Sequence, residues 1–142
     1  PDLAIYASDS SLPALEVAEE NSIVHGVRSH IIFLCGDLLQ PLPGPADMII
    51  ANLPYVKKAD INNISEPEIA LDGGEDGLDI IRAMVPQISG KLKIDGTLLL
   101  EIGQGQAGAV KHILHNAYPD ALIEVFHDLA GIERVISVRL TA

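Results

Sequence analysis

Three polar residues, Asp9, Asp37 and Asn52, each stand at or just after the end of a short apolar run. If these runs are parallel strands, the three residues share one edge of a sheet, where open parallel sheets bind their ligands. There, one carboxylate can accept both hydroxyl hydrogens of a ribose, and the next can accept from an adenine amino group. Asn52 would then face the reacting atom. Either acid taken alone fits equally well as a residue that starts a turn or caps a helix, and that interpretation stays open.

The sharpest local pattern is Asn52-Leu53-Pro54-Tyr55. It resembles the Asn-Pro-Pro-Tyr signature of S-adenosylmethionine-dependent methyltransferases that act on planar nitrogens. An amide nitrogen is a weak nucleophile because its lone pair is delocalised, so two acceptors that hold its two hydrogens would fix its direction. The side-chain oxygen of Asn52 and the carbonyl of Leu53 can be those acceptors, and Tyr55 can pack against the flat substrate group. Alternatively, the four residues form a strand-ending turn with an anchoring tyrosine.

Four further segments widen this resemblance. They are residues 6–9 with the stretch through Asn21, residues 65–79, residues 96–106 and residues 128–134. In this order and at these spacings they resemble one family, the release factor glutamine methyltransferases, over essentially the whole chain. The resemblance implies an α/β, Rossmann-like fold of class I S-adenosylmethionine-dependent methyltransferases. It also implies methyl transfer to the side-chain amide of the glutamine in the Gly-Gly-Gln loop of peptide chain release factors.

The resemblance also assigns roles to individual residues. Asp9 would hold the ribose of S-adenosylmethionine, and Asp37 with Leu38 would hold its adenine. Asn52, which also borders the cofactor, and Leu53 would hold the glutamine amide, Pro54 and Tyr55 would shape its slot, and the loop from Glu66 and Pro67 to Gly77 would border the substrate entrance. Glu101 ends a strand near the site, and a supporting role is expected for it rather than a catalytic one.

Strands and helices alternate in the sequence. We predict strands at residues 3–7, 31–35, 47–51, 97–102, 122–126 and 135–140, and helices at 11–25, 78–89 and 107–117. The first helix should be capped by Ser11, take Pro13 in its first turn and bury a stripe of Leu15, Val17, Ala18 and Ile23. A turn at Asp95-Gly96 should lead into the fourth strand. This order predicts a mainly parallel, doubly wound sheet with a C-terminal antiparallel hairpin, and the continuous apolar runs predict strands covered on both faces.

Composition and charge limit the kinds of partner and site that we expect. Nine basic and twenty acidic residues give a formal net charge of −11 over 142 residues, which disfavours a nucleic-acid partner and suits a basic protein or a cationic cofactor. No apolar run approaches the ~18 residues of a membrane span, and no signal peptide is recognised. The single cysteine, Cys35, lies in an apolar run, so we expect a buried, reduced thiol and a cytoplasmic protein. His112 and His115 lie three residues apart without an acidic or cysteine partner, so no metal site is expected.

Two departures from the family pattern bear on activity. Leu53 stands where the family has proline, and it can still present its carbonyl but leaves the slot less preorganised. The family's domain also begins with a strand and a Gly-rich turn, preceded by a helical domain, and neither is found ahead of the strand at residues 3–7. We therefore expect residues 1–142 to form one partial methyltransferase domain, truncated at its N-terminus, whose exposed sheet edges favour homo-oligomers.

The missing Gly-rich turn predicts that the 142-residue chain by itself binds S-adenosylmethionine poorly or not at all. Calorimetry on the purified chain tests this, and micromolar binding would overturn it. Light scattering tests the expected oligomer, and a clean monomer mass would count against it.

Other functions stay open. A methyltransferase for a ribosomal-protein glutamine shares the same chemistry, although residues 72–75 favour the release-factor branch. A nucleic-acid adenine methyltransferase should carry a basic target-recognition region, and the net charge of −11 argues against it. The non-enzyme alternative is an inactive remnant or interaction module, which the sequence ahead of Pro1 in the source gene would distinguish.

Overall fold

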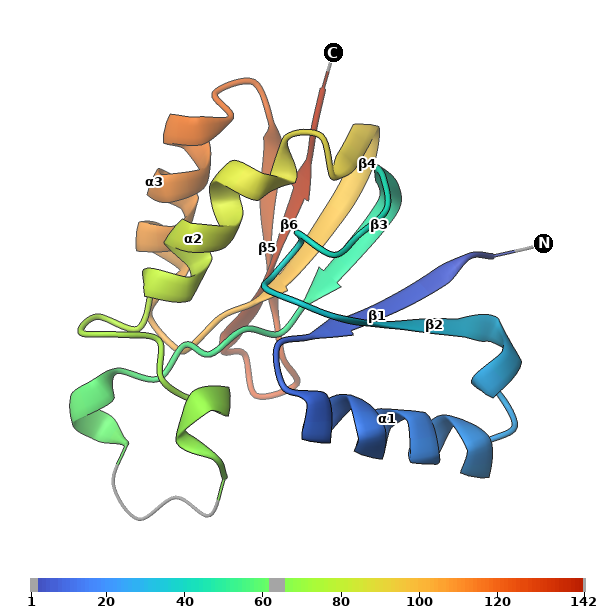
Figure 1. Cartoon of the computed structure of the whole chain (residues 1–142). Coiled ribbons are helices and arrows are strands. Elements are labelled where there is room, and N and C mark those ends of the chain that lie inside the picture. Colours follow the sequence, from blue (N-terminus) through green and yellow to red (C-terminus); the bar gives the residue numbers. More distant parts are fainter. Residues whose placement is uncertain (1–2, 62–65, 142) are drawn as a thin grey trace. The chain divides into compact units, whose positions relative to one another are not determined.

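The computed structural model describes residues 3–61 and 66–141 (Figure 1). Its contacts divide the chain into an N-terminal unit, Pro1–Gly44, and a C-terminal unit, Pro45–Ala142, and each unit is described by itself. The expected single α/β sheet is therefore present as two sheets, one of two strands and one of four.

The N-terminal unit contains a parallel strand pair and one helix. Its elements are β1 (Ile5–Asp9), α1 (Leu12–Val24), a short 3-10 turn (Arg28–His30) and β2 (Ile31–Cys35). The strands run parallel, with Asp9 opposite Cys35. Ser11 caps α1 as predicted, because its Oγ accepts from the backbone N–H of Ala14 at 3.3 Å, and Pro13 lies in the first turn.

Burial in the N-terminal unit differs from the prediction. Within α1 only Leu15 and Ser22 are buried, whereas Val17 is 57% and Ile23 is 62% exposed, so these two do not belong to the buried stripe. The reason is helical geometry, since positions 15 and 22 are two turns apart on one face and positions 17 and 23 point elsewhere. Cys35 is exposed rather than buried: among the described residues of the unit, α1 is the one α-helix, and it packs against this small sheet.

The C-terminal unit is a mixed four-stranded sheet with two helices on one face (Figure 1). Its elements in chain order are β3 (Ala46–Ala51), short 3-10 turns at Lys58–Asp60 and Glu68–Ala70, α2 (Asp79–Ile88), β4 (Leu92–Glu101), α3 (Ala107–Ala117), β5 (Leu122–His127) and β6 (Glu133–Arg139). The strand order is β3-β4-β6-β5, in which β3 and β4 are parallel and the other two pairs are antiparallel. This confirms the C-terminal antiparallel hairpin: β3, β4 and β5 run in one direction, and β6 runs against them.

The strand β4 begins five residues earlier than predicted, so the turn expected at Asp95-Gly96 is wrong. The segment stays in the sheet as a bulge: Ala46 lies opposite Leu92, but Met48 already lies opposite Thr97. Asp95 absorbs the irregularity with a positive φ of 62°, and its N–H donates to Leu140 at 2.9 Å. A β-bulge bends a strand without ending it, which is why a turn-like dipeptide is found inside β4.

One layer of apolar side chains holds α2 and α3 against the sheet. The fully buried members are Ile81, Met84, Ile88, Leu98, Leu100, Ile102, Val110, Leu114, Ile136 and Val138. On the opposite face of β3, Met48 and Ile50 are 55% and 75% exposed, so the predicted coverage of the strands on both faces is not found within this unit.

Among residues 3–61 and 66–141, no helix is long and apolar enough to cross a membrane.

Candidate active site

The strand β3 delivers the run Asn52–Tyr55 to one edge of the four-stranded sheet. Because β3 is parallel to β4, with Ala51 opposite Leu100, the run leaves the sheet beside the end of β4 at Glu101. Asn52 is exposed, and Leu53, Pro54 and Tyr55 are half-buried. Within the described residues, the side-chain amide of Asn52 makes no hydrogen bond. The amide is therefore available to an incoming ligand.

Tyr55 is anchored through its hydroxyl. Its Oη donates a hydrogen bond to Oε1 of Glu101 at 3.1 Å. Burial, and then this bond, raise the pKa of Tyr55 above its ordinary value of 10.0, and the negative charge of Glu66 adds to the rise while Arg134 opposes it. Glu66 and Arg134 therefore lie within electrostatic reach of the tyrosine. The position expected for Glu101, near the site in a supporting role, agrees with this contact.

This anchor predicts a pH-dependent stability. Since the pKa of Tyr55 in the folded chain lies above 10.0, the unfolded chain loses its proton first as pH rises, and the folded state loses stability above about pH 10. A Tyr55→Phe variant lacks this titration. We expect the free energy of unfolding of the wild type to exceed that of the variant at pH 8, and the difference to shrink between pH 10 and 12. Urea unfolding at each pH measures it, and a difference that stays constant with pH would refute the anchor.

The loop after the run folds back alongside it. The N–H of Val56 donates to Leu71 at 2.9 Å, the N–H of Gly73 donates to Val56 at 2.8 Å, and the N–H of Lys58 donates to Gly74 at 2.9 Å. The segment around Gly73 is thus held against the residues that follow Tyr55. Glu66 and Pro67 are exposed at the start of this loop, whereas Ser65 lies outside the described residues.

The end of the same loop is fixed to the first turn of α2. Asp76 accepts from the N–H of Leu78 at 3.1 Å and from Nη1 of Arg82 at 2.9 Å. The Arg82 guanidinium lowers the pKa of Asp76 to about 2, so the pair persists at any ordinary pH. Gly77 lies between these anchors and Tyr55, with a φ of 79°, a conformation that favours glycine.

Gln106, just before α3, joins these segments, and the sequence analysis did not single it out. Its amide group makes hydrogen bonds with Tyr55, Gly77 and Gly103. The signal available in the sequence was the Gly-X-Gly-X run ahead of a helix, at residues 103–106. The sequence-based predictions gave its last residue, Gln106, no role.

The N-terminal unit brings together the other three candidate residues. The N–H of Gly36 donates to the carbonyl of Asp9 at 3.0 Å, so Asp9 and Asp37 lie at the same end of the strand pair. Oδ1 of Asp9 also accepts from the N–H of Ser11 at 2.7 Å, and Oδ2 of Asp37 accepts from Gln40 at 3.0 Å. The turn and cap interpretation thus holds for part of each carboxylate. Among the described residues, Oδ2 of Asp9 and Oδ1 of Asp37 have no hydrogen-bond partner.

Leu38 adopts an unusual backbone conformation beside these acids. Its φ is +50°, which costs a non-glycine residue about 1–2 kcal/mol. The hydroxyl of Ser8 lies 3.5 Å from its carbonyl oxygen, which links the end of β1 to this turn. Strained backbone of this kind often marks a binding site, so the conformation supports the role suggested for Leu38.

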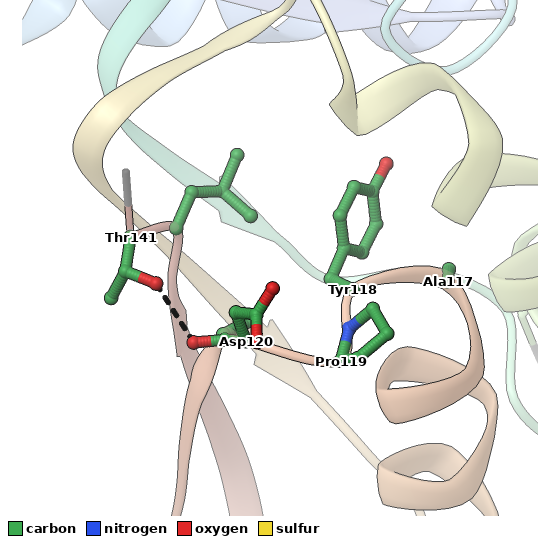
Figure 2. Close-up of a pocket in the computed structure, with 7 residues that line it drawn as sticks. Ala117, Tyr118, Pro119, Asp120 and Thr141 are labelled. Atoms are coloured by element: carbon green, nitrogen blue, oxygen red, sulfur yellow. Dashed lines mark hydrogen bonds between the residues drawn. The ribbon is translucent and has the colours of Figure 1, made fainter.

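A pocket in the C-terminal unit lies away from the run Asn52–Tyr55. It is lined by residues 117–121 with Leu140 and Thr141, at the C-terminal end of α3 (Figure 2). Thr141 closes one side through a hydrogen bond to the carbonyl of Asp120 at 2.8 Å. Tyr118 turns toward α2, where its Oη donates to the carbonyl of Val85 at 2.8 Å. The first bond joins the segment after β6 to the turn before β5, and the second joins the end of α3 to α2. In the part of the chain that the structure describes, no cluster of His, Cys, Asp and Glu could hold a metal ion.

Comparison with known proteins finds similar sequences over most of this chain. No family model matches it. It is 39% identical over 138 residues to the release factor glutamine methyltransferase of Bradyrhizobium diazoefficiens, covering 93% of this chain and 46% of that protein. It is 40% identical over 140 residues to that of Moorella thermoacetica, covering 94% of this chain and 50% of that protein. The chain is homologous to the release factor glutamine methyltransferases. It spans about half the length of these relatives.

Solved structures of other methyltransferases have the same fold as this chain. A ribosomal protein L11 methylase from Lactobacillus delbrueckii subsp. bulgaricus has a TM-score of 0.68 at 21% identity, and covers 96% of this chain and 58% of its own. A methyltransferase from Pyrococcus furiosus has a TM-score of 0.74 at 12% identity, and covers 96% of this chain and 62% of its own. The fold is that of the Rossmann-like class I methyltransferases, as the sequence predicted.

Proposed function

We propose that the protein transfers a methyl group from S-adenosylmethionine to the side-chain amide nitrogen of a glutamine in a peptide chain release factor. The observation that carries this proposal is the run Asn52–Tyr55. The run leaves the sheet with the Asn52 amide exposed and without a hydrogen-bond partner among the described residues, while Tyr55 is fixed by Glu101. The homology to release factor glutamine methyltransferases supports it over most of this chain.

The proposed chemistry follows from the acceptors of the run. S-adenosylmethionine supplies a methyl group on a sulfonium sulfur, which makes its carbon electrophilic. Oδ1 of Asn52 and the carbonyl oxygen of Leu53 accept the two hydrogens of the glutamine amide and hold the nitrogen lone pair in line with that carbon. The nitrogen–carbon bond forms as the carbon–sulfur bond breaks, and the surplus proton on nitrogen passes to water at the exposed Asn52. Tyr55 supports the flat amide from the side.

The acids of the N-terminal unit suit the cofactor. Ribose hydroxyls and an adenine amino group are hydrogen-bond donors, and a carboxylate is an acceptor with several lone pairs. Asp9 and Asp37 each keep one oxygen without a hydrogen-bond partner among the described residues, so each can take such a donor while holding its turn. We therefore assign Asp9 to the ribose, and Asp37 with Leu38 to the adenine.

The net charge bears on the substrate. A chain with a formal charge of −11 repels a phosphate backbone, which disfavours nucleic-acid adenine as the acceptor of the methyl group. A protein loop carries no such penalty. The charge does not separate a release factor from a ribosomal protein, so that choice rests on the homology and is tested directly.

A competition experiment tests the substrate. The purified full-length gene product is incubated with radiolabelled S-adenosylmethionine and three acceptors in parallel: a release factor, ribosomal protein, and adenine-containing DNA. We expect label in the release factor, and no label when its Gly-Gly-Gln glutamine is replaced by alanine. Label in the ribosomal protein or in DNA, with none in the release factor, would reject the proposed substrate.

A further inference from the structure

We propose that Gln106 is the positioning residue of this site: it holds the run Asn52–Tyr55 against the loop at Gly77 and the turn at Gly103 that follows β4, and so fixes the direction of the two acceptors. This inference rests on the proposed function, because it concerns how the acceptors of that reaction are held. Gln106 itself lies outside the set of residues that the sequence or the family resemblance assigned a role.

The amide of Gln106 uses both of its functions. Nε2 donates to the carbonyl of Tyr55 at 3.0 Å and to the carbonyl of Gly77 at 3.3 Å. Oε1 accepts from the N–H of Gly103 at 2.8 Å. A side-chain amide has two N–H hydrogens and one carbonyl oxygen, so both hydrogens and the oxygen are engaged. The side chain therefore has one orientation, because turning the amide over would oppose its oxygen to two carbonyls.

The three partners come from separate parts of the chain. Gln106 is 51 residues from Tyr55 and 29 residues from Gly77, so one side chain joins the run, the loop and the end of β4. Its own backbone is held at the start of α3, since its N–H donates to Gly103 at 3.1 Å and its carbonyl accepts from Val110 at 3.0 Å. Ala107 and Val110 are 2% and 0% exposed, so the core fixes this end of the helix.

Two glycines leave room for this side chain. A Cβ on Gly103 would lie 2.9 Å from Oε1 of Gln106 and 3.1 Å from the ring of Tyr55. A Cβ on Gly77 would lie 2.7 Å from Nε2 of Gln106 and 2.4 Å from the carbonyl oxygen of Tyr55. The amide of Gln106 is therefore packed between two backbone positions at which a residue with a Cβ would collide with it.

The consequence for the reaction lies at Tyr55. Gln106 fixes its backbone carbonyl, and Glu101 fixes its hydroxyl at 3.1 Å, so both ends of the residue are held. Leu53, whose carbonyl is a proposed acceptor, is two residues upstream with Pro54 between them, and proline restricts that link. A displacement of about 1 Å in a reacting group can lower a rate by about 10²-fold. Gln106 thus acts through Tyr55 and touches no reacting atom.

The test compares Gln106→Met and Gln106→Glu with the matched control Gln104→Met. Gln104 is exposed in the adjoining turn. In the full-length gene product we expect both Gln106 variants to lower kcat for release factor methylation by about 10–100-fold. The KM for S-adenosylmethionine should change by less than about threefold, because its ribose and adenine are assigned to Asp9, Asp37 and Leu38. The control should keep wild-type kcat. Thermal unfolding confirms that each variant is folded at the assay temperature.

A second readout does not depend on activity. With ¹³C-labelled tyrosine, we expect the ring resonance of Tyr55 in Gln106→Met to move from its wild-type position and its titration to shift toward that of free tyrosine, while Gln104→Met leaves both unchanged. A folded Gln106→Met variant with wild-type kcat and an unmoved Tyr55 resonance would overturn the inference. If the wild type fails to methylate the release factor, the proposed function fails, and the Tyr55 resonance still decides whether Gln106 positions the run.

Discussion

Replacing Asn52 by alanine is expected to lower methyl transfer to a release factor by about 10²–10³-fold, the loss found when one preorganised hydrogen-bonding group is removed from an active site. Asn52 is exposed and unpaired among the described residues, so its truncation breaks no internal hydrogen bond. The free energy of unfolding should therefore change by less than about 0.5 kcal/mol, as for a surface substitution. A large kinetic loss with an unchanged stability is the signature of a group that contacts substrate.

The measurement is single-turnover transfer from labelled S-adenosylmethionine, with urea unfolding run on the same preparations. The control is Asn116→Ala, which removes an exposed amide from the last turn of α3, at the end of that helix opposite Gln106; this amide lies 3.1 Å from Nε2 of His112, so some stability is expected to be lost in the control. We expect wild-type transfer from the control. Transfer by Asn52→Ala within twofold of the control would remove Asn52 from the reaction.

Replacing Gly77 by alanine is expected to destabilise the chain by about 2–4 kcal/mol, from a left-handed backbone penalty of about 1 kcal/mol together with the cost of overpacking. Gly77 has a φ of 79°, and a Cβ there would lie 2.4 Å from the carbonyl oxygen of Tyr55, which is backbone and cannot rotate away. The loop or the run Asn52–Tyr55 must therefore shift. Because the acceptors of the reaction belong to that run, methyl transfer should fall together with the stability.

Gly90 provides the control for this substitution. Its φ of 84° is nearly the same, but nothing lies within 4 Å of a Cβ built on it. Gly90→Ala should therefore show the backbone penalty alone, about 1 kcal/mol, with wild-type transfer below its melting temperature. Denaturant unfolding of both variants separates the two contributions. Equal losses at the two positions would show that the close approach to Tyr55 has no energetic weight.

Apolar patterning predicted the regular elements well. β2 and α3 begin and end where the sequence placed them, and β3 differs by one residue. Patterning was less informative about burial. Val17 and Ile23 are apolar yet exposed, because their side chains leave α1 away from the face that carries Leu15. The sequence also predicted a turn at Asp95-Gly96, because a bulge with a positive φ uses the same residue types as a turn.

The site was predictable in part for a comparable reason. The apolar runs predict where the strands end, and so they predict that Asp9, Asp37 and Asn52 lie at strand ends. The bond from Tyr55 to Glu101 and two of the bonds of Gln106 join residues that are 29 to 51 positions apart. The third bond of Gln106 closes a turn with Gly103. Contacts of that kind depend on how β4 and α3 pack, and the periodicity of apolar residues does not predict them.

The most direct test of the account is the position of the transferred methyl group. After incubation of the full-length gene product with S-adenosylmethionine and a release factor, tandem mass spectrometry of the Gly-Gly-Gln peptide locates the modification. The account predicts a single methyl group on the side-chain amide nitrogen of that glutamine, absent when Asn52→Ala is used. A methyl group on another residue, or equal modification by the Asn52→Ala variant, would contradict it.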